Sequence, residues 1–227
     1  MSQDAKAQGS KTVPLAGGPL PALPTGNLFI RAIEFHQPAG SFFPSLKHVP
    51  GLIFQAEGSQ VLAIQDGPTV NIGPAQGFFL GPLAHTHTNP GLAENHWYFV
   101  ALWPTSARSS PLVSSSAIVP YETLDFPLTT FSPSPYIETL RWVALEPGGR
   151  TGAAKYGGIV ALFVLEGSIR VRAAGKSAVT LAADHGASEL PGTATQIFNL
   201  ASGRSTFLAF HVTAAGQPFE TPVDQSP

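Results

Sequence analysis

The hydrophobic positions of this chain fall in short runs separated by turn residues. Residues 28–35 alternate between apolar and polar side chains, and residues 51–56 and 61–64 form apolar runs. The Gln-Asp-Gly-Pro sequence at 65–68 has the composition of a β-turn. This pattern predicts short strands, and a hairpin where a turn joins two of them.

The second half of the chain has a similar pattern. Apolar runs at 159–165 and 168–172 are followed by turn residues at 173–176. No window of 12 or more residues carries a helical period, and the apolar runs are far shorter than the roughly 20 residues of a membrane-spanning helix. Many short strands at close spacing predict an all-β sandwich or barrel of the jelly-roll type, with no membrane segment.

The two halves are related by an internal repeat. Adding 109 to the positions of Glu57-Gly58-Ser59 gives Glu166-Gly167-Ser168. The same shift carries Pro38, Gly40, Phe54, Gly77 and Pro82 onto Pro147, Gly149, Phe163, Gly186 and Pro191, and it needs no gap. A repeat of this length predicts two tandem barrels of about 100 residues each.

The composition between the repeats suggests the domain boundaries. Residues 1–27 are rich in Ala, Gly, Pro, Ser and Gln and show no period, so we expect a flexible arm. The two barrels are expected at 28–103 and 137–213. Residues 104–136 are rich in Ser, Thr and Pro and are expected to be a linker, and 214–227 a C-terminal tail.

Charge and cysteine content narrow the possible partners. The net charge is −2, charged residues make up 11% of the chain, and Lys and Arg form no run, so we expect no nucleic-acid partner. Cysteine is absent, which excludes disulfides and thiolate ligands. No secretory signal is visible at the N-terminus. We expect a cytoplasmic protein, with an exported mature form as the alternative.

Two motifs in each half resemble those of the cupin family. The segments 54–58 (Phe-Gln-Ala-Glu-Gly) and 163–167 (Phe-Val-Leu-Glu-Gly) resemble the hairpin that ends the first cupin motif. Residues 77–82 (Gly-Phe-Phe-Leu-Gly-Pro), followed by His85, His87 and Asn89, resemble the second. The resemblance implies a bicupin, a protein of two tandem jelly-roll barrels, and cupins often pair through sheet edges. We therefore expect a homodimer.

The resemblance also implies a metal site, although the ligands depart from the family pattern. A metal-binding cupin usually supplies a His-x-His pair and a Glu from the first motif, then one His from the second. In this chain the positions of the His-x-His pair are near Ser45 and Lys47, and His48 is displaced from them by one residue. The position of the Glu is near Gly51. The family's Pro-to-His spacing favours His87 over His85. No glutamate stands in for the missing ligand.

Our hypothesis is a site for one divalent transition metal in the first barrel. His48, His85 and His87 are the expected ligands and His96 is a reserve, because imidazoles suit Fe, Mn, Ni, Cu or Zn. His96 shares a strand face with Glu94 and Tyr98, and the Tyr98 phenol is a candidate proton donor beside the metal. The shift of 109 places Gly157, Ala194 and Gln196 opposite the three histidines, so we expect a degenerate second copy without metal.

Three classes of function remain open at this point. The first is a metal-dependent enzyme that acts on a small organic substrate, with dioxygenase-like oxidoreduction as the leading reaction and an isomerase or decarboxylase as alternatives. The second is a module that binds or senses a small molecule without a metal. The third is a structural bicupin. Aromatic side chains concentrated in the first half are expected to be core residues or to line a cavity for an apolar or aromatic ligand.

Overall fold

The computed structural model describes residues 5–46, 48–112, 114–131 and 135–227. Strands dominate, and helix occurs in short 3-10 turns such as η2 (Thr105–Ala107) and η3 (Leu128–Thr130). Among the described residues, no helix is both long enough and apolar enough to cross a bilayer. The chain divides into two compact units. We call Leu15–Phe131 the first barrel, and Met1–Pro14 together with Ser132–Pro227 the second barrel.

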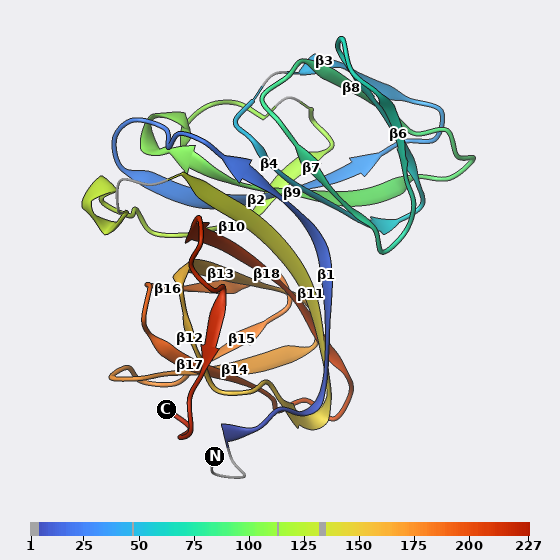
Figure 1. The fold of residues 1–227 in the computed structure, drawn as a ribbon. Coiled ribbons are helices and arrows are strands. Elements are labelled where there is room, and N and C mark those ends of the chain that lie inside the picture. Colours follow the sequence, from blue (N-terminus) through green and yellow to red (C-terminus); the bar gives the residue numbers. More distant parts are fainter. Residues whose placement is uncertain (1–4, 47, 113, 132–134) are drawn as a thin grey trace. The chain divides into compact units, whose positions relative to one another are not determined.

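The first barrel consists of two antiparallel sheets, shown in blue to green in Figure 1. One sheet has the strand order β10-β2-β9-β4-β7 and the other has the order β3-β8-β5-β6. This arrangement of two facing sheets is a jelly roll. The strands are β2 (Leu28–Gln37), β3 (Phe42–Leu46), β4 (Gly51–Glu57), β5 (Gln60–Ile64), β6 (Thr69–Ile72), β7 (Gly77–Leu80), β8 (His85–Thr88), β9 (Asn95–Pro104) and β10 (Ala117–Glu122).

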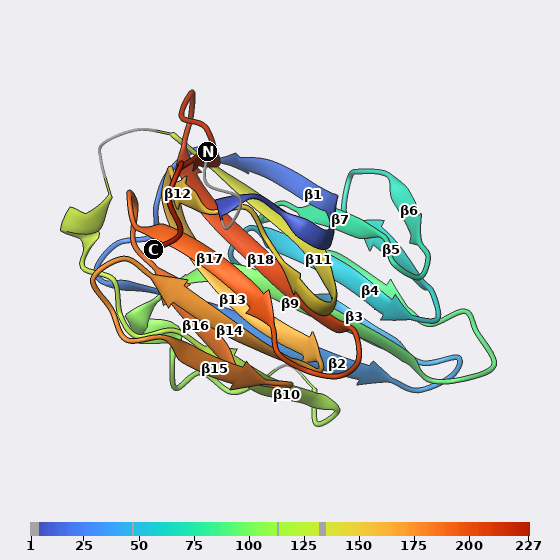
Figure 2. The ribbon, with the colours of Figure 1, turned by 90° about the horizontal axis from the view of Figure 1, so that it is seen from below.

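The second barrel is a single continuous sheet with the order β15-β14-β17-β11-β18-β13-β16, seen in yellow to red in Figure 2. Strand β12 pairs with β17 and β19, and strand β1 pairs with β11. The strands are β11 (Tyr136–Arg150), β12 (Ala154–Tyr156), β13 (Gly158–Glu166), β14 (Ser168–Ala173), β15 (Val179–Ala182), β16 (Gly186–Glu189), β17 (Ala194–Asn199), β18 (Ser205–Ala214) and β19 (Glu220–Pro222).

Each barrel has its own core, built from the inward positions of its strands. In the first barrel Trp97, Phe99 and Ala101 alternate along β9 and pack with Phe35 and Ile53. In the second barrel a corresponding cluster gathers around Leu162 and Phe207. Because side chains alternate between the two faces of a strand, the residues between these positions point away from each core.

Matching turns and hydrogen bonds relate the two barrels. Gly58 and Gly167 both adopt a positive φ, 68° and 76°, which glycine accepts without strain. Nδ2 of Asn89 and Nδ2 of Asn199 each donate to three backbone carbonyls in equivalent loops. The offset is 109 at these glycines and again at Gly77 and Gly186, but 110 at the two asparagines, so the constant offset of 109 fails between β7 and β8. Loops absorb the extra residue without disturbing the strands.

Three segments expected to lack regular structure contain strands. The expected flexible arm, residues 1–27, contains the whole of β1 (Gln8–Leu20), and the backbone of Leu15 lies close enough to Gly77 to exclude a side chain there. The expected linker contains β10, which pairs with β2. The expected tail contains β19, which pairs with β12. Edge strands need only backbone partners, so the composition of these segments gave little sign of them.

Candidate metal centre in the first barrel

Three of the four histidines predicted as metal ligands gather inside the first barrel. His85 and His87 occupy alternate positions on β8, and both side chains are buried. His48 follows β3, which neighbours β8 in the sheet. The centre of the His85 ring lies 4.8 Å from that of His48 and 5.0 Å from that of His87. Because a metal–nitrogen bond is about 2.1 Å long, two neighbouring rings at these distances can bind the same ion.

Hydrogen bonds determine which ring nitrogen carries the proton in His48 and His85. Nδ1 of His48 lies 2.6 Å from the carbonyl oxygen of Val49, and Nδ1 of His85 lies 2.7 Å from that of Leu83. A carbonyl oxygen can only accept, so Nδ1 is the donor in both rings. In the neutral imidazole the lone pair is then on Nε2, which is the atom left for a metal ion.

His87 is held in the same tautomer by two glutamines. Its Nδ1 lies 2.6 Å from Oε1 of Gln60, whose amide nitrogen donates to Oε1 of Gln55 at 2.7 Å. The Gln55 amide nitrogen donates in turn to the backbone carbonyls of Glu57 and His96. These two carbonyls fix the orientation of both amides. Gln60 therefore presents an acceptor to His87, and the Nε2 lone pair of His87 is left for another partner.

Burial keeps the three rings neutral at pH 7. Loss of hydration lowers the pKa of His48 to about 4, lowers the pKa of His85, and lowers the pKa of His87 well below its usual value. Nε2 of His85 is buried and has no hydrogen-bond partner within the described part of the chain. Neutral imidazoles with Nδ1 hydrogen-bonded and Nε2 free have the form that metal-binding histidines take, so these residues fit a transition-metal ion.

The glutamate position of the family pattern is occupied by an aromatic ring. A Cβ atom added to Gly51 would stand 2.4 Å from Cζ of Phe99 and 2.7 Å from Cβ of Ala101. No acidic side chain fits there while Phe99 keeps its place. The donors that the structure brings together at this site are therefore imidazole nitrogens.

A cavity of about 170 Å³ adjoins His48 and His87. A cavity of about 150 Å³ lined by apolar side chains holds a molecule the size of benzene. Arg31 lies in the wall, and its guanidinium donates to the Glu122 carboxylate and to the carbonyl of Arg108, both at 2.6 Å. The wall is otherwise mainly apolar and aromatic, with Ile33, Phe35, Trp97, Phe99, Trp103, Ser110, Pro111 and Leu112 completing it.

The remaining predicted site residues, His96 and Tyr98, lie on the opposite face of β9. Trp97 and Phe99 point into the core, so the residues that alternate with them point outward. The His96 ring stacks on His36 of β2 with 4.6 Å between ring centres, and Tyr98 lies 4.9 Å from His96. The structure thus separates His96 and Tyr98 from the three-histidine cluster.

His96 belongs to a second group of potential ligands, which we call the outer cluster: Glu34, His36 and His96. One ligand atom from each of these residues lies within 4.8 Å of the other two, close enough to hold one metal ion. Burial alone would lower the pKa of His36, but hydrogen bonds to Glu94 and Glu34 outweigh it and raise that pKa. The sequence carried a signal for this group, since a Glu-x-His pair occurs at 34–36 and again at 94–96.

Strand pairing identifies the residues of the second barrel that match the histidines. In the first barrel Leu62 pairs with His87, and the equivalent Val171 in the second barrel pairs with Ile197. Counted in this way, the residues at the positions of His48, His85 and His87 are Tyr156, Thr195 and Ile197. The constant shift had assigned Gly157, Ala194 and Gln196. It fails because the offset is 108 from β3 to β12 (Leu46 to Ala154) and 110 from β8 to β17 (His87 to Ile197).

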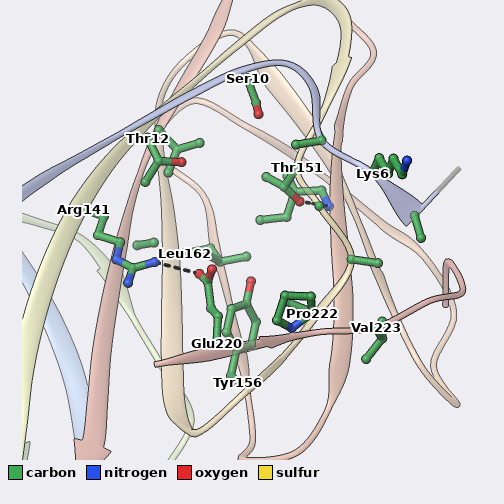
Figure 3. Close-up of a pocket in the computed structure, with 18 of the residues that line it drawn as sticks. Lys6, Ser10, Thr12, Arg141, Thr151, Tyr156, Leu162, Glu220, Pro222 and Val223 are labelled. Atoms are coloured by element: carbon green, nitrogen blue, oxygen red, sulfur yellow. Dashed lines mark hydrogen bonds and ion pairs between the residues drawn. The ribbon is translucent and has the colours of Figure 1, made fainter. Parts of the chain in front are cut away.

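The second barrel encloses a cavity of about 490 Å³, shown in Figure 3. Tyr156 stands in its wall, and burial raises the pKa of the phenol, so the hydroxyl stays protonated. Arg141 donates to Glu220 of β19 at 3.0 Å. Lys6, Ser10, Thr12 and Thr151 add to the polar part of the lining. Of the three residues that replace the histidines, Tyr156 and Ile197 line this cavity, so a phenol stands where the first barrel has His48.

The chain is similar in fold to several solved structures, although no protein-family profile and no curated protein matches it. Two variants of oxalate decarboxylase from Bacillus subtilis have TM-scores of 0.62 and 0.63 at 10% identity. They align with 96% and 94% of this chain and with 80% of their own. Another structure of that enzyme, described for its Mn(II) centres, has a TM-score of 0.61 at 12% identity, with 96% and 80% of the two chains covered. This likeness establishes the cupin fold, with jelly-roll barrels.

Proposed function

We propose that the first barrel binds one divalent transition metal through Nε2 of His48, His85 and His87. The observation that carries this proposal is the common state of the three rings. His85 and His87 are buried and His48 is partly buried, burial lowers the pKa of all three rings, and each has its Nδ1 proton directed at a fixed acceptor. Nε2 of His85 is buried without a hydrogen-bond partner among the described residues, and a bound metal ion would supply one.

The donor set favours particular metals. Imidazole suits Fe, Ni, Cu and Zn, whereas Mn is better served by carboxylate and water oxygens. Because Phe99 occupies the position of the family's glutamate, this site supplies nitrogen alone. We therefore expect Fe, Ni, Cu or Zn in this chain, in contrast to the Mn(II) centres described for the similar decarboxylase.

The adjoining cavity suggests the type of substrate. Its aromatic wall and its volume of about 170 Å³ suit a small apolar or aromatic molecule with an oxygen that can reach the metal. Three protein ligands leave coordination positions open for substrate oxygen or dioxygen. Trp97 and Phe99 exclude water around the site, and the histidines hold the ion. On this basis we propose dioxygenase-like oxidoreduction as the reaction.

We propose a different role for the second barrel. Tyr156, Thr195 and Ile197 replace the imidazoles there, so it would bind no metal at the matching position. Its larger cavity, lined by Arg141 and Tyr156, favours binding of a small molecule without metal chemistry as the second candidate function. We further propose that the protein is a homodimer, which sedimentation velocity will test.

The metal content of tag-free protein tests the main proposal. We expect His87→Ala to lose one equivalent of Fe, Ni, Cu or Zn relative to the wild type, as measured by inductively coupled plasma mass spectrometry. His185→Ala is the matched control, because this histidine is exposed on the second barrel. Equal metal content in the wild type and His87→Ala, with both proteins folded, would contradict the proposal.

A further inference from the structure

Two Glu-x-His pairs lie side by side on the outward face of β2 and β9. The strands pair in a register that places His36 directly opposite His96. Glu34 precedes His36 by two residues, and Glu94 precedes His96 by two residues. Residues at i and i+2 share a strand face, so these side chains project from the same surface, away from the core that contains Trp97.

The ligand atoms of the outer cluster lie close enough together to surround one ion. Oε1 of Glu34 lies 3.0 Å from Nε2 of His36 and 2.7 Å from Nε2 of His96. Two ligand atoms bound to one tetrahedral ion at about 2.1 Å stand about 3.4 Å apart, so binding would require these contacts to widen by about half an ångström. The two imidazole rings are nearly parallel, at an interplanar angle of 15°. Both rings thus present Nε2 to the same carboxylate oxygen.

A hydrogen bond does not account for the short contact between His96 and Glu34, which is an ion pair only when the ring is protonated. Nε2 of His96 is buried and has no hydrogen-bond partner among the residues that the structure describes, although Oε1 of Glu34 is only 2.7 Å away. The contact is therefore short without having the direction of a hydrogen bond. An ion placed to one side of the line between the two atoms would accept a lone pair from each of them.

Glu94 orients His36 for this role. Its Oε1 lies 3.0 Å from Nδ1 of His36, and Nε2 of the same ring is hydrogen-bonded to Oε1 of Glu34 at 3.0 Å, so a bound ion would take the place of the proton on Nε2. A carboxylate that holds the second ring nitrogen is a common outer partner of metal-bound histidines. The Glu94 side chain is 56% exposed, so we treat it as a positioning residue rather than a ligand.

The outer cluster is open to solvent on one side. The side chain of His36 is 42% exposed, that of His96 is 22% exposed and that of Glu34 is 10% exposed. An ion can reach the imidazoles from water, while the carboxylate that would neutralise part of its charge is held in the sheet. Two nitrogens and one oxygen leave a fourth tetrahedral position for a water molecule.

We propose that Glu34, His36 and His96 form a second metal site on the outer face of the first barrel, suited to Zn²⁺. The site is separate from the three-histidine cluster, because the two lie on opposite faces of β9. Bound metal would join β2 to β9 at the position where His36 and His96 pair. The proposal of this outer site does not depend on the metal or the chemistry proposed for the barrel interior.

Zinc titration of chelator-treated protein tests this second site. Isothermal titration calorimetry with zinc chloride should show one equivalent fewer for His36→Ala than for the wild type, and one equivalent fewer for Glu34→Gln. His87→Ala should keep the outer equivalent, so the two sites are scored independently. Circular dichroism and thermal unfolding check that each variant is folded. His185→Ala, on the second barrel, should match the wild type.

A conservative change probes the positioning residue. Glu94→Gln keeps a side chain of the same size but weakens its hold on Nδ1, so we expect the zinc affinity of the outer site to fall by about 10-fold or more, with unchanged stoichiometry. If folded His36→Ala and Glu34→Gln bind as many equivalents of zinc as the wild type, the outer site does not exist. This result would leave the interior site unaffected, because His87→Ala tests it separately.

Discussion

At the scale of single residues, the hydrogen-bond partners of a histidine carry more information than its spacing in the sequence. His85, His87 and His96 are all near one another in the chain, yet only the first two face the barrel interior. What favours the interior rings as candidate ligands is that each Nδ1 proton has a fixed acceptor. That information depends on Leu83 and Gln60, which no histidine motif includes.

Gln60 offers a test at this scale. Gln60→Leu removes the acceptor for Nδ1 of His87 without touching a ligand atom, so His87 can adopt the other tautomer or rotate. We expect the metal affinity of the interior site to fall by about 10- to 100-fold, as is usual for outer partners of metal ligands. Competition with a coloured chelator measures this affinity.

Two control measurements show whether Gln60 positions His87. Gln217→Leu, an exposed change in the second barrel, should leave the affinity unaltered. Thermal unfolding of Gln60→Leu reports any general loss of packing around Gln55. If the variant binds metal as tightly as the wild type, Gln60 does not position His87.

At the scale of strands, the pairing of β4 with β9 limits which side chains can stand beside the three histidines. Gly51 pairs with Leu80 on one side, and the Phe99 ring covers the space where its side chain would stand. A family pattern assigns a glutamate near this position, but the ring of Phe99 and the methyl group of Ala101 leave no room for one. The ligand set is thus limited by packing between strands, not by the ligands' own motif.

Gly51→Ala tests this packing. The new Cβ would lie 2.4 Å from the Phe99 ring, so the ring and Ala101 must shift, and we expect a loss of about 1–3 kcal/mol in the free energy of unfolding. Chemical denaturation measures the loss. Combining Gly51→Ala with Phe99→Leu should cost less than the sum of the single changes, because the smaller side chain makes room.

A glycine with open surroundings serves as the control. No atom lies within 4 Å of a Cβ added to Gly81, so Gly81→Ala should change the free energy of unfolding little. Additive effects of Gly51→Ala and Phe99→Leu would show that the two positions do not compete for space, which would contradict our explanation of the missing glutamate.

At the scale of the whole molecule, the sequence predicted the fold better than it predicted the site. The repeat and the hairpin glycines are local features, so Gly58 and Gly167 could be matched without a structure. The pairing of β2 with β9 is a long-range feature, and it is what brings Glu34 and His36 to His96. Nothing in the spacing of these residues reveals which strands will be neighbours.

The register of strands in the second barrel was also beyond what the sequence could predict. A one-residue difference in loop length moves β17, so Ile197 rather than Gln196 takes the place of His87. Strand β8 reads His-Thr-His-Thr and has no apolar residue to align with Ile197 of β17, so the sequence could not fix the register. Strands β1 and β19 were missed because their stability comes from backbone pairing with other strands.

His211 gives the second barrel a predictable response to acid. It is fully buried, and burial lowers its pKa to about 3. The unfolded chain therefore binds a proton near pH 6.5 that the folded chain binds only near pH 3. This residue therefore leaves the free energy of unfolding unchanged above pH 6.5. Between pH 6.5 and about pH 3 it lowers that free energy by about 1.4 kcal/mol for each pH unit of acidification.

His211→Leu should remove this dependence. Both ring nitrogens of His211 lack a hydrogen-bond partner among the described residues, so we expect the variant to be at least as stable as the wild type at pH 7. Urea denaturation between pH 4 and pH 7.5 should show a shallower loss on acidification. If the free energy of unfolding fell equally with pH in the two proteins, His211 would not be the source of the acid response. His185 is exposed, so His185→Leu should follow the wild type.

The central claim is that three imidazoles bind one metal inside the first barrel, and X-ray absorption spectroscopy tests it most directly. We would measure His36→Ala loaded with zinc, in which the outer cluster lacks a ligand and the interior site is intact. We expect the fine structure to show three imidazole ligands, with metal–nitrogen distances of about 2.0–2.1 Å. A spectrum dominated by oxygen ligands, or protein that takes up no zinc, would contradict the account.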